Sequence, residues 1–258
     1  MPRTTAVILA AGAGTRLTGS DVIRPKCLAR FGSSTLLELQ MRVLRVHGID
    51  DVVVVVGYEA SRVRAACGPE TRFVENTQFL DTNSLYSMLL AQPLLRGGLV
   101  LMNCDVLFHP SLLGDLLTSR HENALLVSYP ASGDPPFTAE EMKVRVRRGC
   151  VDDIRKDLPL EEVDGENVGI AKFSADGAAR LMTLAGAIVG SGGVKDWAPR
   201  GFGAFARERS LYAIGTRGLP WTEIDTADDY RYASSVVYPA IRAVFEELPD
   251  ERAVETLR

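Results

Sequence analysis

The start of the chain holds the pattern that most restricts its fold: a short apolar run that leads straight into a loop of very small residues. Residues 6–9 read Ala-Val-Ile-Leu, which is typical of a buried strand. Residues 10–15 then read Ala-Ala-Gly-Ala-Gly-Thr. Gly12 and Gly14 allow positive φ and a close approach of the backbone, so neighbouring N–H groups can converge on phosphate oxygens. The pattern predicts a phosphate-binding loop at the end of a strand.

Two cations follow this loop and strengthen the prediction. Arg16 comes directly after it, and Lys26 stands a short distance further on in an Arg-Pro-Lys sequence. A Walker loop does not fit, because no lysine follows Gly14 in its register, and a Rossmann fingerprint would need glycine where this chain has Leu17. We expect Arg16 and Lys26 to hold the phosphates of a nucleoside triphosphate and to stabilise charge there.

Strand and helix patterns alternate through the first half of the chain. Residues 35–47 carry apolar side chains at helical spacing, residues 52–58 form a β-branched run, and residues 99–105 form an apolar run that ends on a carboxylate. This alternation predicts an α/β fold with a doubly wound, mostly parallel sheet. Ligands bind such sheets at the carboxyl ends of the strands, where Gly57-Tyr58 also falls.

The second half of the chain is less regular and predicts a smaller α+β part. Residues 142–155 read as a hairpin, residues 175–185 as a helix, and the glycine-rich residues 186–193 as a mobile segment. We expect one domain over residues 1–258, with residues 1–130 binding the nucleotide and residues 131–258 binding the acceptor.

Asp105 and Asp225 each close a strand-like run, so both can point into the crevice at the carboxyl edge of the sheet. Mg²⁺ prefers carboxylate oxygens and water, and often takes only one or two carboxylates from the protein. An aspartate at a strand end is equally well explained as the cap of the next helix. The pattern alone leaves both interpretations open.

Composition and charge exclude several classes of partner and cofactor. The net charge of −4 argues against a general nucleic-acid surface, and the four cysteines have no C-x-x-C spacing that would indicate zinc. No apolar run approaches the ~18 residues of a membrane span, and no signal-peptide pattern opens the sequence. We therefore expect a cytoplasmic protein without nucleic-acid or membrane partners. These features leave open whether the protein forms a homodimer.

The residues of the loop and of the Pro-Lys segment together resemble the signature of the sugar-phosphate nucleotidylyltransferase superfamily, L-A-A-G-x-G-T-R-L…P-K. The resemblance implies a Rossmann-like nucleotidyltransferase fold, Arg16 and Lys26 as catalytic residues, and Mg²⁺ held by Asp105 and Asp225. Asn103 stands where many relatives have an acidic residue, so no third carboxylate ligand is expected at that position. The implied nucleotide-binding loop consists of Leu9, Ala10, Ala11, Gly12, Ala13, Gly14 and Thr15.

Residues 83–88 read Asn-Ser-Leu-Tyr-Ser-Met and narrow the resemblance to the small cytidylyltransferases that activate phosphocholine or a phosphonate such as 2-aminoethylphosphonate. Asn83 and Ser84 can simply cap a helix. The resemblance implies that they also hold the nucleobase and ribose, with Gly57 and Tyr58 bordering the same pocket and CTP as the donor.

The resemblance continues through the second half and implies a site for the acceptor. Three lysines of this half, Lys143, Lys156 and Lys172, are candidates to bind the phosphate or phosphonate of the acceptor, although each can equally be a solvated surface charge. Trp197 can wall a choline cage or fill the core, and Glu166 or Asp196 can bind a primary ammonium. The candidate acceptor residues are Lys143, Lys156, Glu166, Lys172, Asp196 and Trp197.

These features predict a cytidylyltransferase that moves CMP from CTP to a small phosphonate or phosphate acid and releases pyrophosphate. The acceptor would be 2-aminoethylphosphonate, a hydroxyalkylphosphonate or phosphocholine. Two alternatives remain: a sugar-1-phosphate nucleotidylyltransferase that uses UTP, dTTP or GTP, and a non-catalytic nucleotide-sensing subunit.

Overall fold

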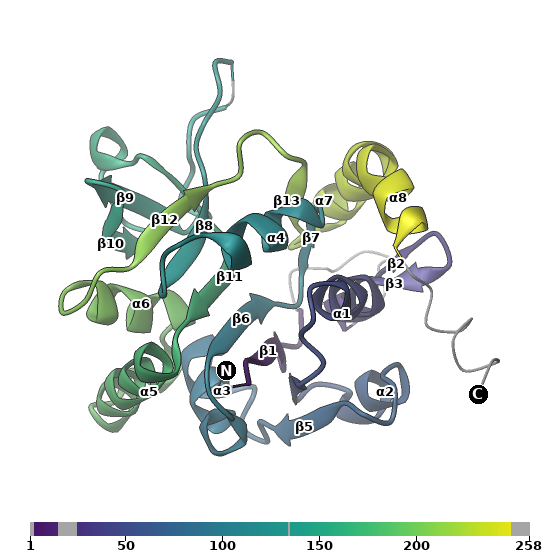
Figure 1. Cartoon of the computed structure of the whole chain (residues 1–258), viewed down its shortest axis with the longest axis horizontal. Helices are drawn as coiled ribbons and strands as arrows, with labels where there is room; N and C mark the ends of the chain where they lie inside the picture. Colours follow the sequence, from purple (N-terminus) through teal and green to yellow (C-terminus); the bar gives the residue numbers. More distant parts are fainter. Residues whose placement is uncertain (1–2, 15–24, 134, 249–258) are drawn as a thin grey trace.

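The structure is a computed structural model that describes residues 3–14, 25–133 and 135–248 (Figure 1). Within these ranges, one nine-stranded sheet runs through the molecule. In spatial order its strands are β5 (Arg72–Glu75), β4 (Val52–Val56), β1 (Thr5–Ala10), β6 (Leu99–Asn103), β11 (Gly165–Phe173), β8 (Ala124–Ser128), β12 (Tyr212–Gly215), β10 (Cys150–Arg155) and β9 (Lys143–Arg147).

Strand direction changes across the sheet. β5, β4, β1 and β6 are mutually parallel, as a doubly wound sheet requires. β11 runs antiparallel to both β6 and β8, β12 is parallel to β8, and β10 pairs antiparallel with β9 and β12. The predicted α/β fold is confirmed, with the parallel order concentrated in the first half and a mixed order in the second. From residues 131–258, β9, β10, β11 and β12 join this sheet, while the division into two functional halves stays a prediction.

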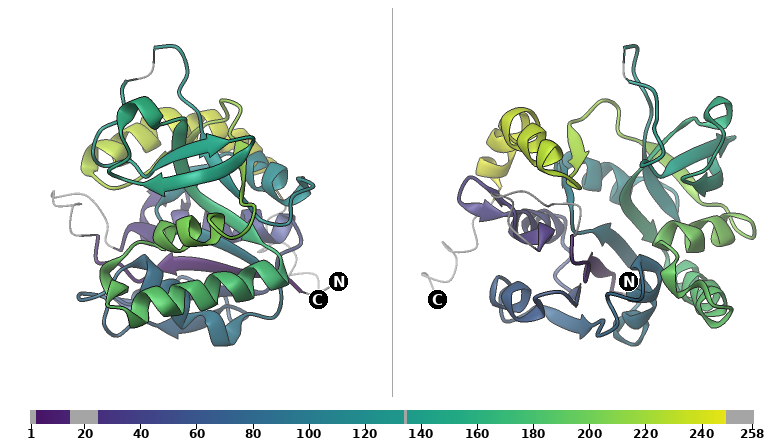
Figure 2. Two further views of the ribbon diagram at one scale, coloured as in Figure 1. Left: turned by 90° about the vertical axis from the view of Figure 1, so that its left-hand side faces the viewer. Right: turned by 180° about the vertical axis from the view of Figure 1, so that it is seen from behind.

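Helices cover both faces of the sheet and bury two separate cores (Figure 2). In β1, Ala6 and Ile8 enter one core while Val7 and Leu9 enter the other, because successive strand residues point to opposite faces. One core is closed by α1 (Leu36–Val46), α2 (Ala60–Ala65), α4 (Ser111–Thr118), α7 (Ala227–Tyr232) and α8 (Tyr238–Glu247). The other is closed by α3 (Ser84–Leu90), α5 (Ala175–Gly190) and α6 (Ala198–Ala206).

The prediction of a mobile segment at residues 186–193 is wrong. Helix α5 continues through Gly190, and a single 3-10 turn, Gly193–Lys195, follows it. Ile188 and Val189 pack against the second core, so tertiary burial overcomes the low helix propensity of the glycines. The hairpin expected at residues 142–155 is present as β9 and β10.

Two short pairings complete the frame around the carboxyl edge of the sheet. β7 (Val106–Phe108) pairs antiparallel with β13 (Trp221–Glu223), which brings the segments of Asp105 and Asp225 together. The hairpin of β2 (Arg30–Phe31) and β3 (Ser34–Thr35) leads into α1. Within the described ranges, no helix combines the length and the apolar character needed to cross a membrane.

Candidate active site

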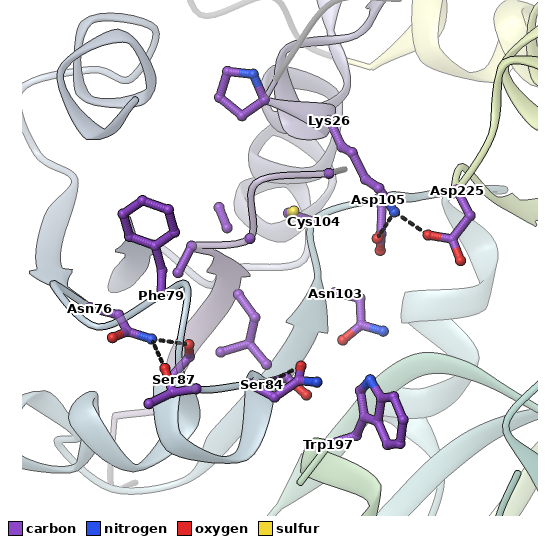
Figure 3. A pocket seen from close by; sticks show the side chains of 18 of the residues that line it. Lys26, Asn76, Phe79, Ser84, Ser87, Asn103, Cys104, Asp105, Trp197 and Asp225 are labelled. Atoms are coloured by element: carbon purple, nitrogen blue, oxygen red, sulfur yellow. Dashed lines mark hydrogen bonds and ion pairs between the residues drawn. The ribbon is translucent and has the colours of Figure 1, made fainter. Parts of the chain in front are cut away.

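A cavity of about 260 Å³ opens where β1 and β6 end (Figure 3). The register sets Leu9 beside Asn103 and Ala10 beside Val56, so the loop after β1 and the turn after β6 meet at one edge of the sheet. The cavity is lined by Leu9, Ala10, Ala11, Gly12, Gly14, Pro25, Lys26, Asn76, Phe79, Thr82, Asn83, Ser84, Ser87, Asn103, Cys104, Asp105, Trp197, Glu223 and Asp225.

The loop after β1 forms one wall as predicted, with Gly14 at a φ of +57°. A Cβ at Gly14 would stand 3.1 Å from Cγ of Lys26, so the glycine also leaves room for the lysine to cross the loop. Ala13 is described but does not line the cavity. Thr15 and Arg16 lie outside the described residues, so their roles remain predictions from the sequence.

Gly57 and Tyr58 do not line the cavity, contrary to expectation, but support its wall from behind. The Tyr58 amide donates to the Ala11 carbonyl at 3.0 Å, and a Cβ at Gly57 would stand 2.7 Å from that same oxygen. The glycine is therefore needed for the close approach of two backbones. The register of β1 and β4 puts these residues behind the loop.

Lys26 reaches into the cavity and lies between two carboxylates. Its Nζ is 3.1 Å from Oδ2 of Asp105 and also forms an ion pair with Asp225. Burial by itself lowers the pKa of Lys26, but Asp105 and Asp225 outweigh it and raise the pKa above its usual range. The lysine is therefore fully charged at neutral pH.

Asp105, Glu223 and Asp225 form a carboxylate cluster in which one oxygen from each lies within 4.8 Å of the others. The Ile224 amide donates to the Asp105 carbonyl at 2.9 Å and ties the two segments together. Burial, followed by Asp105 and Asp225, raises the pKa of Glu223 to about 8. The set suits Mg²⁺, because it consists of carboxylates alone and already holds a cation, the Lys26 ammonium.

Glu223 was not assigned as a ligand from the sequence, although a signal for it exists. It stands two residues before Asp225, and residues two apart on an extended strand share one face. The helix cap that competes with metal binding is formed by another residue: Asp229 accepts from the Asp225 amide at 3.0 Å and forms a capping box with Thr226. The Asp225 side chain is thereby left to face Lys26.

Asn83 and Ser84 line the cavity and also begin α3. Oδ1 of Asn83 accepts from the Ser84 amide at 2.8 Å, and Oγ of Ser84 accepts from the Ala198 amide at 2.8 Å. The Asn83 amide donates to the Val194 carbonyl at 2.9 Å. The start of α3 is thus tied to the segment that carries Trp197.

A polar group beside α3 was missed by sequence reasoning. Nδ2 of the buried Asn76 donates to Oγ1 of Thr82 at 2.9 Å and to Oγ of Ser87 at 3.0 Å (Figure 3). Phe79 completes this end of the cavity. The available signal was the position of Asn76, directly after β5, at the carboxyl end of a parallel strand.

Cys104 also lines the cavity. Its hydrogen bond with Cys27, followed by burial, raises the pKa of its thiol well above the usual value. The thiol stays protonated at neutral pH, and we assign it no role as a nucleophile.

A second cavity, of about 760 Å³, shares Glu223 and Asp225 with the first. Glu166 lines it, together with Glu140, Glu141 and Trp221. Burial, then Glu141, raises the pKa of Glu166 to about 7, although Lys143 acts in the opposite direction.

Trp197 and Lys156 stand together at the border of the first cavity. Trp197 is 47% exposed, and Nζ of Lys156 lies 5.2 Å from its ring centroid and 3.5 Å from Oε2 of Glu140. The ring face of Trp197 therefore already accepts a cation.

The other three candidate acceptor residues line neither cavity. Lys172 donates to the Ser119 carbonyl at 3.0 Å at the far edge of the sheet, because β11 runs antiparallel to β6. Lys143 is only 2% exposed and donates to the Lys156 carbonyl at 2.6 Å. Asp196 lies beside Arg200, outside both cavities, with 3.9 Å between their charged atoms. Strand direction, which the residue pattern does not reveal, carries Lys172 away from the site. Lys143 stays beside Glu166, its partner in the pairing of β9 with β11, but is buried behind the second cavity.

The fold places this cavity at the carboxyl edge of the parallel strands, where α/β proteins of this class bind their ligands. Residues 6–176 match the family model described as a MobA-like NTP transferase domain, and the chain belongs to that family of nucleotidyltransferases.

Curated relatives agree with this assignment. The chain is 32% identical over 237 residues to the bifunctional IPC transferase and DIPP synthase of Rubrobacter xylanophilus, covering 90% of this chain and 51% of that protein. It is 33% identical over 119 residues to the choline-phosphate cytidylyltransferase of Streptococcus pneumoniae, covering 45% of this chain and 51% of that protein. The chain thus spans about half the length of these two relatives. They confirm the resemblance to small cytidylyltransferases.

Solved structures share the fold. The inositol-1-phosphate CTP transferase from T. maritima has a TM-score of 0.75 at 24% identity, over 97% of this chain and 99% of that one. The CTP:phosphocholine cytidylyltransferase from Streptococcus pneumoniae has a TM-score of 0.71 at 23% identity, over 91% of this chain and 99% of that one. At these identities the likeness supports the α/β fold alone.

Proposed function

We propose that this chain transfers a cytidylyl group from CTP to a small acceptor that carries a phosphate or phosphonate, with release of pyrophosphate. The observation that carries the proposal is the layout of the first cavity. Lys26 lies between Asp105 and Asp225 at one end, and polar side chains at the start of α3 lie at the other. A nucleotide would span the two, with its phosphates at the lysine. The curated relative named as a choline-phosphate cytidylyltransferase supports CTP as the donor.

The start of α3 suits a pyrimidine. Oδ1 of Asn83 is already used by its helix cap, and Oγ of Ser84 already accepts from Ala198. Among the described contacts, Nδ2 of Asn83 and the hydroxyl hydrogen of Ser84 remain able to donate. Cytosine presents a carbonyl oxygen and a ring nitrogen as acceptors, so these two donors can recognise it.

In the reaction, an acceptor oxygen attacks the α-phosphorus of CTP, and the bond to the bridging oxygen of the leaving pyrophosphate breaks. Lys26 neutralises charge on the α-phosphate. Asp105 and Asp225, with Glu223 beside them, would hold Mg²⁺, which supplies charge stabilisation at the phosphates. The acceptor is already an oxyanion at neutral pH, so no general base is needed, and catalysis rests on positioning and electrostatics.

The donor and acceptor preferences are tested by measuring pyrophosphate release with CTP, UTP, dTTP and GTP. Each donor is paired with 2-aminoethylphosphonate, phosphocholine, inositol 1-phosphate and glucose 1-phosphate. We expect CTP to give the highest kcat/KM, because a pocket of few donors suits a pyrimidine. Faster turnover with UTP or dTTP and the hexose phosphate would replace the proposal by the sugar-1-phosphate alternative, and no turnover with any pair would favour a nucleotide-sensing subunit.

The second cavity favours an acceptor with an ammonium group. Glu140, Glu141 and Glu166 line it, and it adjoins the carboxylate cluster where the acceptor must meet the α-phosphate. Carboxylates attract a cationic head and give a neutral polyol only hydrogen bonds. Lys156 already covers the ring of Trp197, so we place the ammonium at Glu166 and favour 2-aminoethylphosphonate over phosphocholine.

Glu166→Gln should raise the KM for 2-aminoethylphosphonate roughly tenfold to a hundredfold, since a hydrogen bond to a charged group contributes ~1.5–3 kcal/mol. The wild-type KM should also fall as pH rises through about 7, because Glu166 becomes ionised in that range, and Glu166→Gln should lose this dependence. Steady-state kinetics between acid and mildly alkaline pH measure both effects.

Two controls belong to this experiment. Hydroxyethylphosphonate has no ammonium group, so its KM should be insensitive to Glu166→Gln. Trp197→Ala should weaken phosphocholine by ~1–2 kcal/mol if the ring forms a cage for a quaternary ammonium. An unchanged KM for 2-aminoethylphosphonate in Glu166→Gln would show that the amine is not bound there.

A further inference from the structure

One buried polar side chain connects the scaffold to the carboxylate cluster. Gln40 lies on α1 and is 1% exposed. Its Nε2 donates to the Asn103 carbonyl at 2.9 Å and to the Val106 carbonyl at 2.9 Å. These carbonyls bracket the turn that carries Cys104 and Asp105. Both hydrogens of the amide nitrogen therefore form hydrogen bonds with the backbone on either side of Asp105.

The oxygen of the Gln40 amide, by contrast, forms no hydrogen bond of this kind. Oε1 of Gln40 is buried and has no hydrogen-bond partner among the described residues. Such an orphaned acceptor costs stability, so at a position this buried an apolar residue of similar volume would avoid a cost that Gln40 carries. Turning the amide over would set Oε1 against two carbonyl oxygens, so the two donated bonds determine its orientation.

Helix α1, which carries Gln40, is itself fixed at its start, so the two hydrogen bonds of Gln40 hold the Asp105 turn against a fixed support. Thr35 and Glu38 form a capping box at its start, and the Leu36 amide donates to the Ala29 carbonyl at 2.8 Å, just after the 3-10 turn Lys26–Leu28. The same helix therefore supports the segment of Lys26 at its beginning and the turn of Asp105 through Gln40. On its other side, the Ile224 amide holds the Asp105 carbonyl.

We propose that Gln40 is a positioning residue for nucleotidyl transfer: its amide holds the Asn103–Val106 turn so that the Asp105 carboxylate stays aligned with Lys26 and Asp225. The inference rests on the proposed function only for its catalytic consequence, because the alignment of the carboxylates is a property of the free protein. Gln40 itself touches neither nucleotide nor acceptor and does not line either cavity.

The test compares Gln40→Met with Leu44→Ala, a buried apolar position one turn further along the same helix whose side chain can form no hydrogen bond to the Asp105 turn. Mn²⁺ alone is titrated into the free protein and followed by electron paramagnetic resonance, and kcat, KM and the thermal midpoint are measured in parallel. Groups that orient metal ligands typically contribute about 10–100-fold to affinity or activity. We expect Gln40→Met to lose that much in Mn²⁺ affinity and in kcat, with little change in the KM for CTP. Leu44→Ala should lower only the thermal midpoint.

A second variant covers the case in which Gln40→Met does not fold. Gln40→Glu keeps the shape of the side chain but cannot donate both bonds, so it should lose Mn²⁺ affinity in the same direction. In an Asp105→Asn background, Gln40→Met should cause no further loss of Mn²⁺ affinity, because the two changes act through one carboxylate.

The outcomes separate this inference from the proposed function. Gln40 variants with Mn²⁺ affinity and kcat no different from those of Leu44→Ala would overturn the positioning role while leaving cytidylyl transfer intact. A wild-type protein that transfers no nucleotide would overturn the proposed function, and Mn²⁺ titration of the Gln40 variants would still decide whether the turn is held as inferred.

Discussion

Lys26→Ala should lower kcat/KM for nucleotidyl transfer by at least roughly a hundredfold, because removing one charge stabiliser from a water-poor transition state costs ~3 kcal/mol. The lysine is the only described cation that lies between Asp105 and Asp225. Its raised pKa keeps it charged across the working range of pH. Most of the loss should appear in kcat, since the charge on the α-phosphate grows as the reaction proceeds.

The measurement for Lys26→Ala is steady-state pyrophosphate release, with the thermal midpoint as a check on folding. Arg30→Ala is a matched control, because Arg30 is an exposed cation of the next segment and its side chain donates to the Ser33 carbonyl, away from the carboxylate cluster. It should keep normal activity. A loss of less than tenfold in folded Lys26→Ala would mean that the loop and its lysine bind something other than a reacting nucleotide.

Asp105→Asn and Asp225→Asn should each reduce turnover by about a thousandfold or more, because the divalent ion that they would hold supplies several kcal/mol of charge stabilisation. Each change removes a negative charge with almost no change in volume, so the fold should persist. Both side chains belong to the cluster that includes Glu223. Turnover measured across a range of Mg²⁺ concentrations, together with thermal unfolding, tests this expectation.

Asp228→Asn is the control for the carboxylate variants. Asp228 lies near Asp225 in the chain, but its side chain is exposed and pairs with Arg231. It should leave the Mg²⁺ dependence of turnover unchanged. If folded Asp105→Asn or Asp225→Asn kept near-normal activity at low Mg²⁺, that residue would not be a metal ligand.

Some features of the site follow from short stretches of sequence. The apolar run of β1 and the small loop after it are local patterns, and the structure has both as expected. We could select Lys26 because it follows the small loop, and Asp105 and Asp225 because each ends a strand-like run. The structure brings all three side chains into one cavity. Their catalytic roles stay predictions.

Other features required the tertiary structure. Lys172 and Lys156 were candidates for the same acceptor group, but the antiparallel direction of β11 carries Lys172 to the far edge of the sheet. Glu223 joins the carboxylates only because β13 pairs with β7. Asn76 and Gln40 are polar residues inside apolar surroundings, and their hydrogen bonds join parts of the chain that no local pattern relates.

The strand, the small loop after it, the lysine and the two aspartates could be read from the sequence, because backbone freedom, apolar periodicity and side-chain charge act over a few neighbouring residues. Which distant side chains share a cavity, and which are buried away from it, became visible in the folded chain alone. That choice depends on strand direction, on register and on which face of a helix is covered, and these are set by packing across the whole chain.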